Sequence, residues 1–146
     1  MKTAILYYST HHGNTKKLLD AIAAADADVT LIDVTSAGIT DLGGYSRVGL
    51  ASGVYAGKPA KQLLEFAREY LPVGVPVFCI LTSSMCRDGF FKPLRELAQT
   101  RECKVLGTYQ CQGYDTFGPF KLVGGVSKGH PDEADIRGAV DFYKGL

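Results

Sequence analysis

The chain has 146 residues, of which 46% are hydrophobic and 21% are charged, and its formal net charge at pH 7 is +1. This composition predicts a single soluble globular domain spanning residues 1–146. The balanced charge excludes the basic footprint of a nucleic-acid-binding protein, and no apolar run approaches the roughly 20 residues that span a bilayer.

The N-terminal segment and the cysteines indicate the compartment. The apolar stretch after Lys2 is too short for a signal peptide, and no small-residue cleavage site follows it. Cys79, Cys86, Cys103 and Cys111 include no Cys-x-x-Cys pair, so we expect reduced thiols and no metal site. We therefore expect a cytoplasmic protein that does not bind a membrane.

Strand-like and helix-like segments alternate along the chain. Apolar runs of β-forming residues predict strands at 2–8, 29–34, 47–51, 75–81 and 105–111. Apolar residues at helical spacing predict helices at 16–25, 59–70, 93–99 and 132–144, with Pro59 and Pro93 in the first turns of two of them. Residues 35–44 are too few and too glycine-rich to predict a helix.

This alternation predicts an α/β fold, with a doubly wound, five-stranded parallel sheet that helices cover on both faces. The usual strand order for five such strands is 2-1-3-4-5. In that order the connections after the first and third strands run in opposite directions, and a crevice opens between them at the carboxyl edge. We therefore expect a ligand between residues 9–15 and 52–58.

The first of these loops has the composition of an anion site. The N–H groups and the dipole of a helix N-terminus favour negative charge, and Gly13 lets the backbone turn closely around a phosphate. The sequence contains neither Gly-x-Gly-x-x-Gly nor Gly-Lys-Ser/Thr at this point, so a terminal phosphate monoester is expected. In the alternative interpretation, Thr10 and Asn14 only cap the helix. The candidate residues are Ser9, Thr10, His11, His12, Gly13, Asn14 and Thr15.

Residues 6–15, LYYSTHHGNT, resemble the signature of the flavodoxin family, an aromatic strand end followed by a hydroxyl-rich loop that closes in Gly-Asn-Thr. The resemblance implies a flavodoxin-like fold, in which residues 10–15 hold the phosphate of flavin mononucleotide (FMN). Two features depart from the family pattern. His11 and His12 stand where hydroxyl residues are usual, and Leu19 stands where alanine is usual.

The two histidines change the expected electrostatics of the loop. An imidazole has an ordinary pKa of about 6.5 and can carry positive charge beside a phosphate. On this interpretation the affinity for flavin rises as the pH falls from about 8 to about 6. Alternatively, His11 and His12 contribute only backbone N–H groups, and the affinity does not depend on pH.

The resemblance also assigns the loop after the third strand to the flavin ring. Tyr55 is expected to stack on one face of the ring, and Gly53 or Gly57 to supply the peptide that bonds the flavin N5–H. Alternatively, Tyr55 is a surface tyrosine that covers the core. The candidate residues are Ser52, Gly53, Val54, Tyr55 and Gly57.

The loop after the fourth strand occupies the place of the family's second flavin loop. It lacks the usual aromatic residue, because Phe90 and Phe91 lie close to a helix start and are expected to pack inward. Backbone contacts to flavin are expected from two serines, and the second ring face meets a sulfur side chain or stays open. The candidate residues are Ser83, Ser84, Met85 and Cys86.

Residues 113–131 form a long glycine-rich and aromatic stretch after the fifth strand. A long segment without a clear element is typical of a functional loop. We expect Tyr114, Asp115 or Phe117 to cover the flavin or to form a partner surface. The alternative is a loop packed on its own side chains.

These features favour an FMN-binding electron carrier, monomeric or weakly dimeric, that exchanges electrons with redox proteins such as a reductase or an acceptor oxidoreductase. The alternative enzyme is an NAD(P)H-dependent FMN quinone or flavin reductase of the same fold. A third interpretation is a flavin-free module that binds another phosphate ligand. The balanced charge separates this chain from typical flavodoxins, whose acidity steers them to basic partners.

Overall fold

The computed structural model of the protein describes residues 1–10, 13–113 and 129–146. Its strands are β1 (Thr3–Tyr8), β2 (Val29–Asp33), β3 (Arg47–Tyr55), β4 (Lys58–Pro59), β5 (Val77–Ser83) and β6 (Val105–Gln112). Its helices are α1 (Asn14–Ala25), α2 (Lys61–Tyr70), α3 (Lys92–Thr100) and α4 (Glu133–Lys144), and a 3-10 turn covers Asp88–Phe91. Within the described part of the chain, no helix has the length and apolar character needed to cross a membrane.

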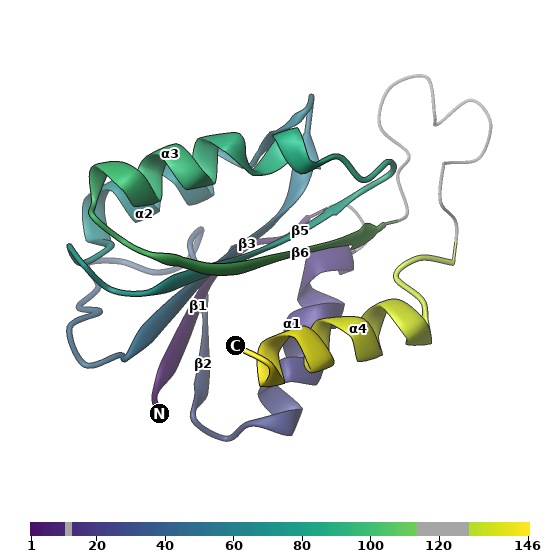
Figure 1. Ribbon diagram of the computed structural model, residues 1–146, viewed down its shortest axis with the longest axis horizontal. Coiled ribbons are helices and arrows are strands. Elements are labelled where there is room, and N and C mark those ends of the chain that lie inside the picture. The colour runs from purple at the N-terminus through teal and green to yellow at the C-terminus, as the bar shows by residue number, and fades with distance from the viewer. Residues whose placement is uncertain (11–12, 114–128) are drawn as a thin grey trace.

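Five strands form a parallel sheet in the order β2-β1-β3-β5-β6, and β4 pairs with β3 in the antiparallel sense (Figure 1). Strand β1 has β2 on one side and β3 on the other, so that Ile5 pairs with Leu31 and with Gly49. Since β5 and β6 are the fourth and fifth predicted strands, the predicted order 2-1-3-4-5 is confirmed. The strand order reverses at β1, and this places the carboxyl ends of β1 and β3 at a crevice.

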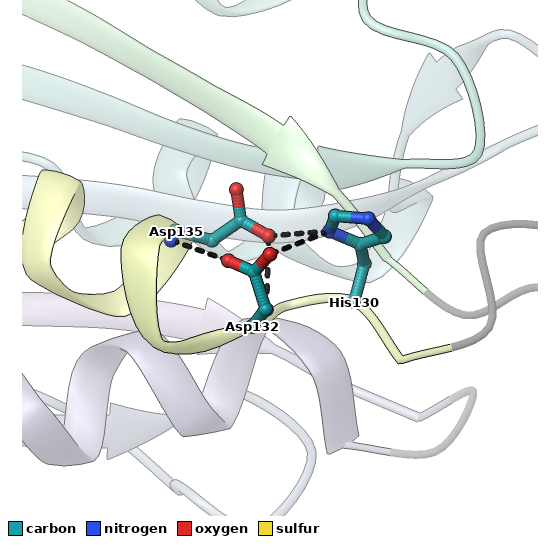
Figure 2. Close-up of side chains that lie close together, drawn as sticks. All are labelled: His130, Asp132 and Asp135. Atoms are coloured by element: carbon teal, nitrogen blue, oxygen red, sulfur yellow. Dashed lines mark hydrogen bonds and ion pairs between the residues drawn. The ribbon is translucent and has the colours of Figure 1, made fainter.

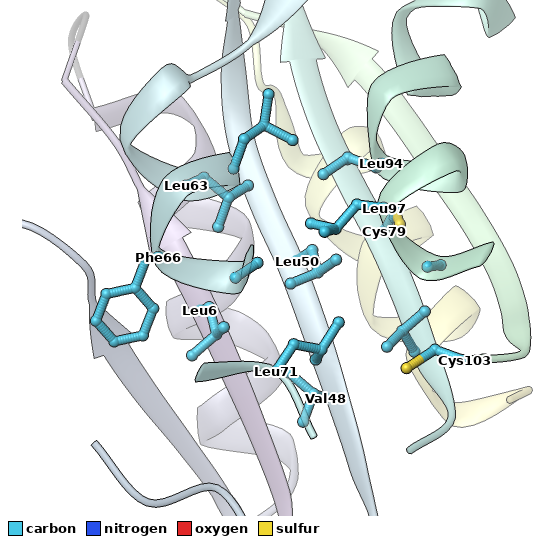
Figure 3. Packing of buried hydrophobic residues seen from close by; sticks show 14 of the residues in the cluster. Leu6, Val48, Leu50, Leu63, Phe66, Leu71, Cys79, Leu94, Leu97 and Cys103 are labelled. Carbon is cyan, nitrogen blue, oxygen red and sulfur yellow. The ribbon is translucent and has the colours of Figure 1, made fainter. Parts of the chain in front are cut away.

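Two helical layers enclose the sheet, with α2 and α3 on one face and α1 and α4 on the other (Figure 1). Leu50 of β3 packs against α2 and α3 in a cluster with Leu63 and Leu94, all three fully buried (Figure 3). Ile5 and Phe78 belong to the cluster on the opposite face. Each buried leucine or isoleucine contributes about 1.5–3 kcal/mol to the stability of the folded state, because its apolar surface is removed from water. The helices on both faces therefore stabilise the sheet.

The segment after the third strand differs from its prediction. Residues 52–55 continue β3, where a loop was predicted, and Tyr55 pairs with Lys58 across a two-residue turn. In that turn Ala56 and Gly57 both have positive φ, 51° and 79°, as a tight hairpin with right-handed strand twist requires. Pro59 lies in β4 and not in the first turn of α2, because a proline fits an edge strand that needs no N–H.

Other boundaries follow the sequence more closely. Pro93 lies in the first turn of α3, and no helix forms in residues 35–44, both as predicted. Phe91 is buried, which confirms that it packs inward. Two elements differ by two residues from their predicted bounds: α1 begins at Asn14 and not at residue 16, and β5 spans Val77–Ser83 and not 75–81.

Candidate functional site

A pocket lies where the ends of β1, β3, β5 and β6 meet the start of α1. Its lining residues come from segments far apart in the sequence and brought together by the strand order. They are Ser9, Thr10, Asn14, Thr15, Gly53, Val54, Tyr55, Thr82, Ser83, Ser84 and Gly113. All of them except Thr82 and Gly113 are candidate residues from the sequence.

The described residues of the first loop, 9–10 and 13–15, lie at the end of β1 and the start of α1. Gly13 has φ +67° and precedes the helix, and its N–H donates to the carbonyl of Thr10 at 2.7 Å. Residues with a side chain rarely adopt this left-handed backbone conformation, so glycine is favoured at position 13. Ser9 Oγ accepts a hydrogen bond from the N–H of Lys16 at 3.3 Å, within the first turn. Gly13 holds the N-cap position and has no side chain with which to cap the helix; the alternative in which Thr10 and Asn14 only cap the helix stays open.

The start of α1 is tied to the sheet through a buried pair of hydroxyls. Thr15 Oγ1 lies 2.9 Å from Thr82 Oγ1, and both residues are at most 2% exposed. Such a pair satisfies two polar groups that would be costly to bury alone. Thr82 was missed because the predicted strand ended one residue earlier, although a hydroxyl residue at the carboxyl end of a central strand is a usable signal.

Tyr55 forms one wall of the pocket. Its hydroxyl lies 3.2 Å from Thr10 Oγ1 and 3.5 Å from the Thr10 nitrogen, so it joins the end of β3 to the first loop. The ring folds back over Gly53, where an added Cβ would come 3.0 Å from the Tyr55 oxygen. Burial raises the pKa of the Tyr55 hydroxyl, while its hydrogen bonds to Thr10 act in the opposite direction. The side chain therefore presents a neutral phenol at the pocket.

Gly113 closes the pocket at the end of β6. Its N–H donates to the carbonyl of Ser83 at 2.9 Å. A Cβ at this position would lie 2.6 Å from Asn14 Nδ2, closer than real contacts allow. The absence of a side chain at Gly113 thus sets the position of the Asn14 amide. No local sequence signal indicates this contact, which depends on the register of β6.

Three candidate residues near the pocket do not line it. Ser52 is fully buried, donates to the Gly53 carbonyl at 2.6 Å and accepts from the Ala60 N–H at 3.1 Å, so it fixes the start of α2. Gly57 lies in the β3–β4 turn. Gly13 shapes the backbone of the first loop. Whether Gly53 or Gly57 bonds a flavin nitrogen stays a prediction.

Met85 and Cys86 lie in the loop after β5, and both are exposed. Met85 is 55% exposed, and its sulfur accepts from Arg87 Nη2 at 3.1 Å. Cys86 as a whole is exposed. Partial removal of its thiol from water raises the thiol pKa, and a hydrogen bond with Ser83 lowers it by less. Neither residue lines the pocket, and contact of either with a flavin stays a prediction.

Several sequence candidates fall outside the described residues. They are His11, His12, Tyr114, Asp115 and Phe117. Their expected roles, including the pH dependence of flavin affinity assigned to the two histidines, stay predictions.

A separate group of three side chains lies at the start of α4 (Figure 2). One potential ligand atom from each of His130, Asp132 and Asp135 lies within 4.8 Å of the others. Their hydrogen bonds account for the arrangement. Asp132 Oδ1 accepts from the Asp135 N–H at 2.9 Å, and Asp135 Oδ2 accepts from the Asp132 N–H at 2.9 Å and faces His130 Nδ1 at 2.7 Å. The group is therefore a capping box with a histidine attached.

Comparisons with known proteins agree with this architecture. Residues 5–81 match the family described as the flavodoxin domain. An uncharacterized protein of Methanocaldococcus jannaschii is 37% identical over 149 aligned residues, which cover 100% of this chain and 98% of the relative.

Solved structures of other proteins are similar in fold. A flavodoxin from the domain Archaea superposes with a TM-score of 0.70 at 16% identity, covering 99% of this chain and 98% of its own. A flavoprotein from Lactobacillus acidophilus in complex with FMN gives a TM-score of 0.58 at 22% identity, covering 75% of this chain and 92% of its own.

Proposed function

The chain belongs to the flavodoxin family, and we propose that its pocket at the carboxyl edge of the sheet binds FMN and that the protein carries electrons. One observation carries the proposal. The polar first loop, with Thr10 and Thr15, and the aromatic wall of Tyr55 line a single pocket at the point where the strand order reverses. Open α/β sheets bind their ligands at this point.

The first loop fits a phosphate monoester. Hydroxyls of Ser9, Thr10 and Thr15 and the amide of Asn14 line the pocket at the N-terminal end of α1. The helix dipole favours an anion there without a positively charged side chain. These residues would hold the FMN phosphate.

The other side of the pocket fits a flat heteroaromatic ring. Tyr55 offers an aromatic surface, and the absence of a side chain at Gly53 lets the Tyr55 ring lie over it. Ser83 and Ser84 also line this pocket. When bound, FMN supplies one-electron and two-electron redox chemistry, and the protein orients the ring and sets its surroundings.

The composition of the pocket supports a carrier. Among its described lining residues none is acidic, basic or a histidine, so none is an obvious general acid or base. An electron carrier requires neither, because the flavin performs the redox step. We propose redox proteins, a reductase or an acceptor oxidoreductase, as its partners.

One observation keeps the reductase as the second candidate. Tyr55 is the single aromatic residue among the described residues that line the pocket, and neither Met85 nor Cys86 lines it. An open ring face would admit a nicotinamide for hydride transfer.

The two candidates differ in a turnover assay on FMN-loaded protein. NADPH or NADH is supplied with a quinone acceptor, and coenzyme oxidation is followed at 340 nm. The proposed carrier gives a rate no higher than free FMN at the same concentration, yet accepts electrons once a flavoprotein reductase is added. Sustained oxidation without added reductase assigns the reductase activity instead.

A further inference from the structure

A second concavity lies beside the proposed flavin pocket, and Tyr55 lines both. This groove, of about 530 Å³, runs between the end of β1, the β3–β4 hairpin and α2. Its size is in the range of small-molecule sites, which span roughly 300–1,000 Å³. The flavin proposal assigns nothing to it.

The groove has an apolar and aromatic floor. Tyr8 and Tyr55 meet edge to face, with ring centroids 5.8 Å apart. Pro59 and Leu64 continue this surface onto the hairpin and α2, and both are buried. A floor of this kind offers aromatic and apolar contact to a planar ring.

The rim of the groove is positively charged. Lys58, Lys61 and Arg68 line it, and none of its described lining residues is acidic. Lys61 pairs with Glu65 at 3.6 Å, but their side chains are 83% and 57% exposed, so the pair is weak and leaves the positive potential largely in place.

The first turn of α2 adds to this potential. Lys61 is the first residue of the helix, and no acidic side chain lies in that turn. The positive end of the helix dipole and the ammonium groups of Lys58 and Lys61 therefore act in the same direction. Lys61, Leu64 and Arg68 are spaced three and four residues apart and so share one face of α2. Along the groove this face presents a positive charge, then an apolar side chain, then a second positive charge.

From this juxtaposition we infer that the groove is a binding site for a phosphorylated nucleotide, separate from the flavin pocket. The base lies on the floor of Tyr8, Tyr55 and Leu64. The phosphates lie at the end formed by Lys58, Lys61 and the start of α2. Because the two sites share only Tyr55, the nucleotide site does not depend on FMN binding.

ADP is the probe, titrated by calorimetry into the full-length protein, with adenosine and inorganic pyrophosphate as its two halves. Lys61→Gln removes one rim charge. Lys92→Gln is the matched control, because Lys92 also begins a helix, is 77% exposed and pairs with a glutamate four residues on, at 3.9 Å. FMN affinity is measured for the same three proteins.

We expect ADP to bind at least about tenfold more tightly than either half, since ring and phosphate contacts combine. Lys61→Gln weakens ADP binding at least about fivefold, and Lys92→Gln changes it less than about twofold. Excess FMN leaves ADP bound. If FMN fails to bind while ADP behaves in this way, only the flavin proposal is lost.

Four results overturn the nucleotide site. The first is no ADP binding at about 10 mM, roughly the weakest affinity that a site could use. The second is equal weakening by Lys61→Gln and Lys92→Gln. The third is displacement of ADP by FMN, which places both in the flavin pocket. The fourth is Lys61-dependent binding of polyglutamate without ADP binding, which assigns the groove to an acidic polypeptide.

Discussion

The Tyr55 hydroxyl lies 3.2 Å from Thr10 Oγ1, so the aromatic wall of the pocket and its polar loop are joined by one contact. This contact crosses the point where the strand order reverses, between the ends of β3 and β1. It holds the ring beside the loop that is proposed to receive the phosphate. The two halves of the proposed flavin site are thus positioned relative to each other before any ligand enters.

The contribution of the Tyr55 ring is separable from that of its hydroxyl. Tyr55→Leu removes the aromatic surface and should weaken FMN binding about tenfold or more, the size of a lost stacking contact. Tyr55→Phe keeps the ring and loses only the hydroxyl contact with Thr10, which is exposed. The FMN affinity of this variant should therefore stay within about threefold of the wild-type value. Quenching of FMN fluorescence measures both. Equal loss in the two variants would assign the effect to the Thr10 contact.

The buried Thr15–Thr82 pair predicts a non-additive effect on stability. Thr15→Val leaves the Thr82 hydroxyl without this partner and should cost about 1–3 kcal/mol. Thr82→Val should cost a similar amount, whereas the double variant replaces both hydroxyls by methyl groups and should be less destabilised than the sum. Urea unfolding gives the free energies. Strict additivity would show that the two hydroxyls do not interact.

Gly113→Ala tests the packing that places Asn14. The new Cβ would lie 2.6 Å from Asn14 Nδ2, so either the amide or the end of β6 must move. We expect a stability loss of about 1–3 kcal/mol from overpacking and weaker FMN binding. Gly44→Ala is the control, because a Cβ there meets nothing within 4 Å. Wild-type FMN affinity in Gly113→Ala would remove Asn14 from the proposed phosphate contacts.

His130 predicts a pH-dependent contribution to stability. Its hydrogen bond to Asp135 raises the pKa of the imidazole, with further raising by the charges of Asp135 and Asp132 and a smaller opposing effect of burial. A raised pKa stabilises the folded state fully below the ordinary value of about 6.5, and this stabilisation is lost as the pH rises through the folded-state pKa.

His130→Gln should therefore lower the free energy of unfolding more at about pH 5.5 than at about pH 9, as urea titrations at the two values would show. A difference that is equal at both, or larger at high pH, would mean that the protonated imidazole does not stabilise the start of α4.

The parts of the site that follow from the sequence are those set by local chemistry. The turn at Gly13 and the polar residues Thr10, Asn14 and Thr15 adjoin one another in the chain, and a strand-to-helix loop brings them to the pocket by itself. The parallel sheet follows from the alternation of apolar strands and amphipathic helices, and right-handed crossovers restrict its order.

The features that were missed depend on contacts between distant segments. Thr82 reaches the pocket because β5 continues beside β3, with Gly53 paired to Thr82. Gly113 reaches Asn14 only through the register of β6. The continuation of β3 through Tyr55 requires its pairing with β4, and small residues such as Ser52 and Gly53 conceal that strand in the sequence.

The central claim is that the first loop holds the phosphate of FMN. Its most direct test compares the dissociation constants of FMN and riboflavin, which differ only in that phosphate, by fluorescence titration of the flavin-free protein. The account predicts that FMN binds at least about a hundredfold more tightly, the gain of several charge-assisted hydrogen bonds. Equal affinity for the two flavins, or no binding of either, would contradict it.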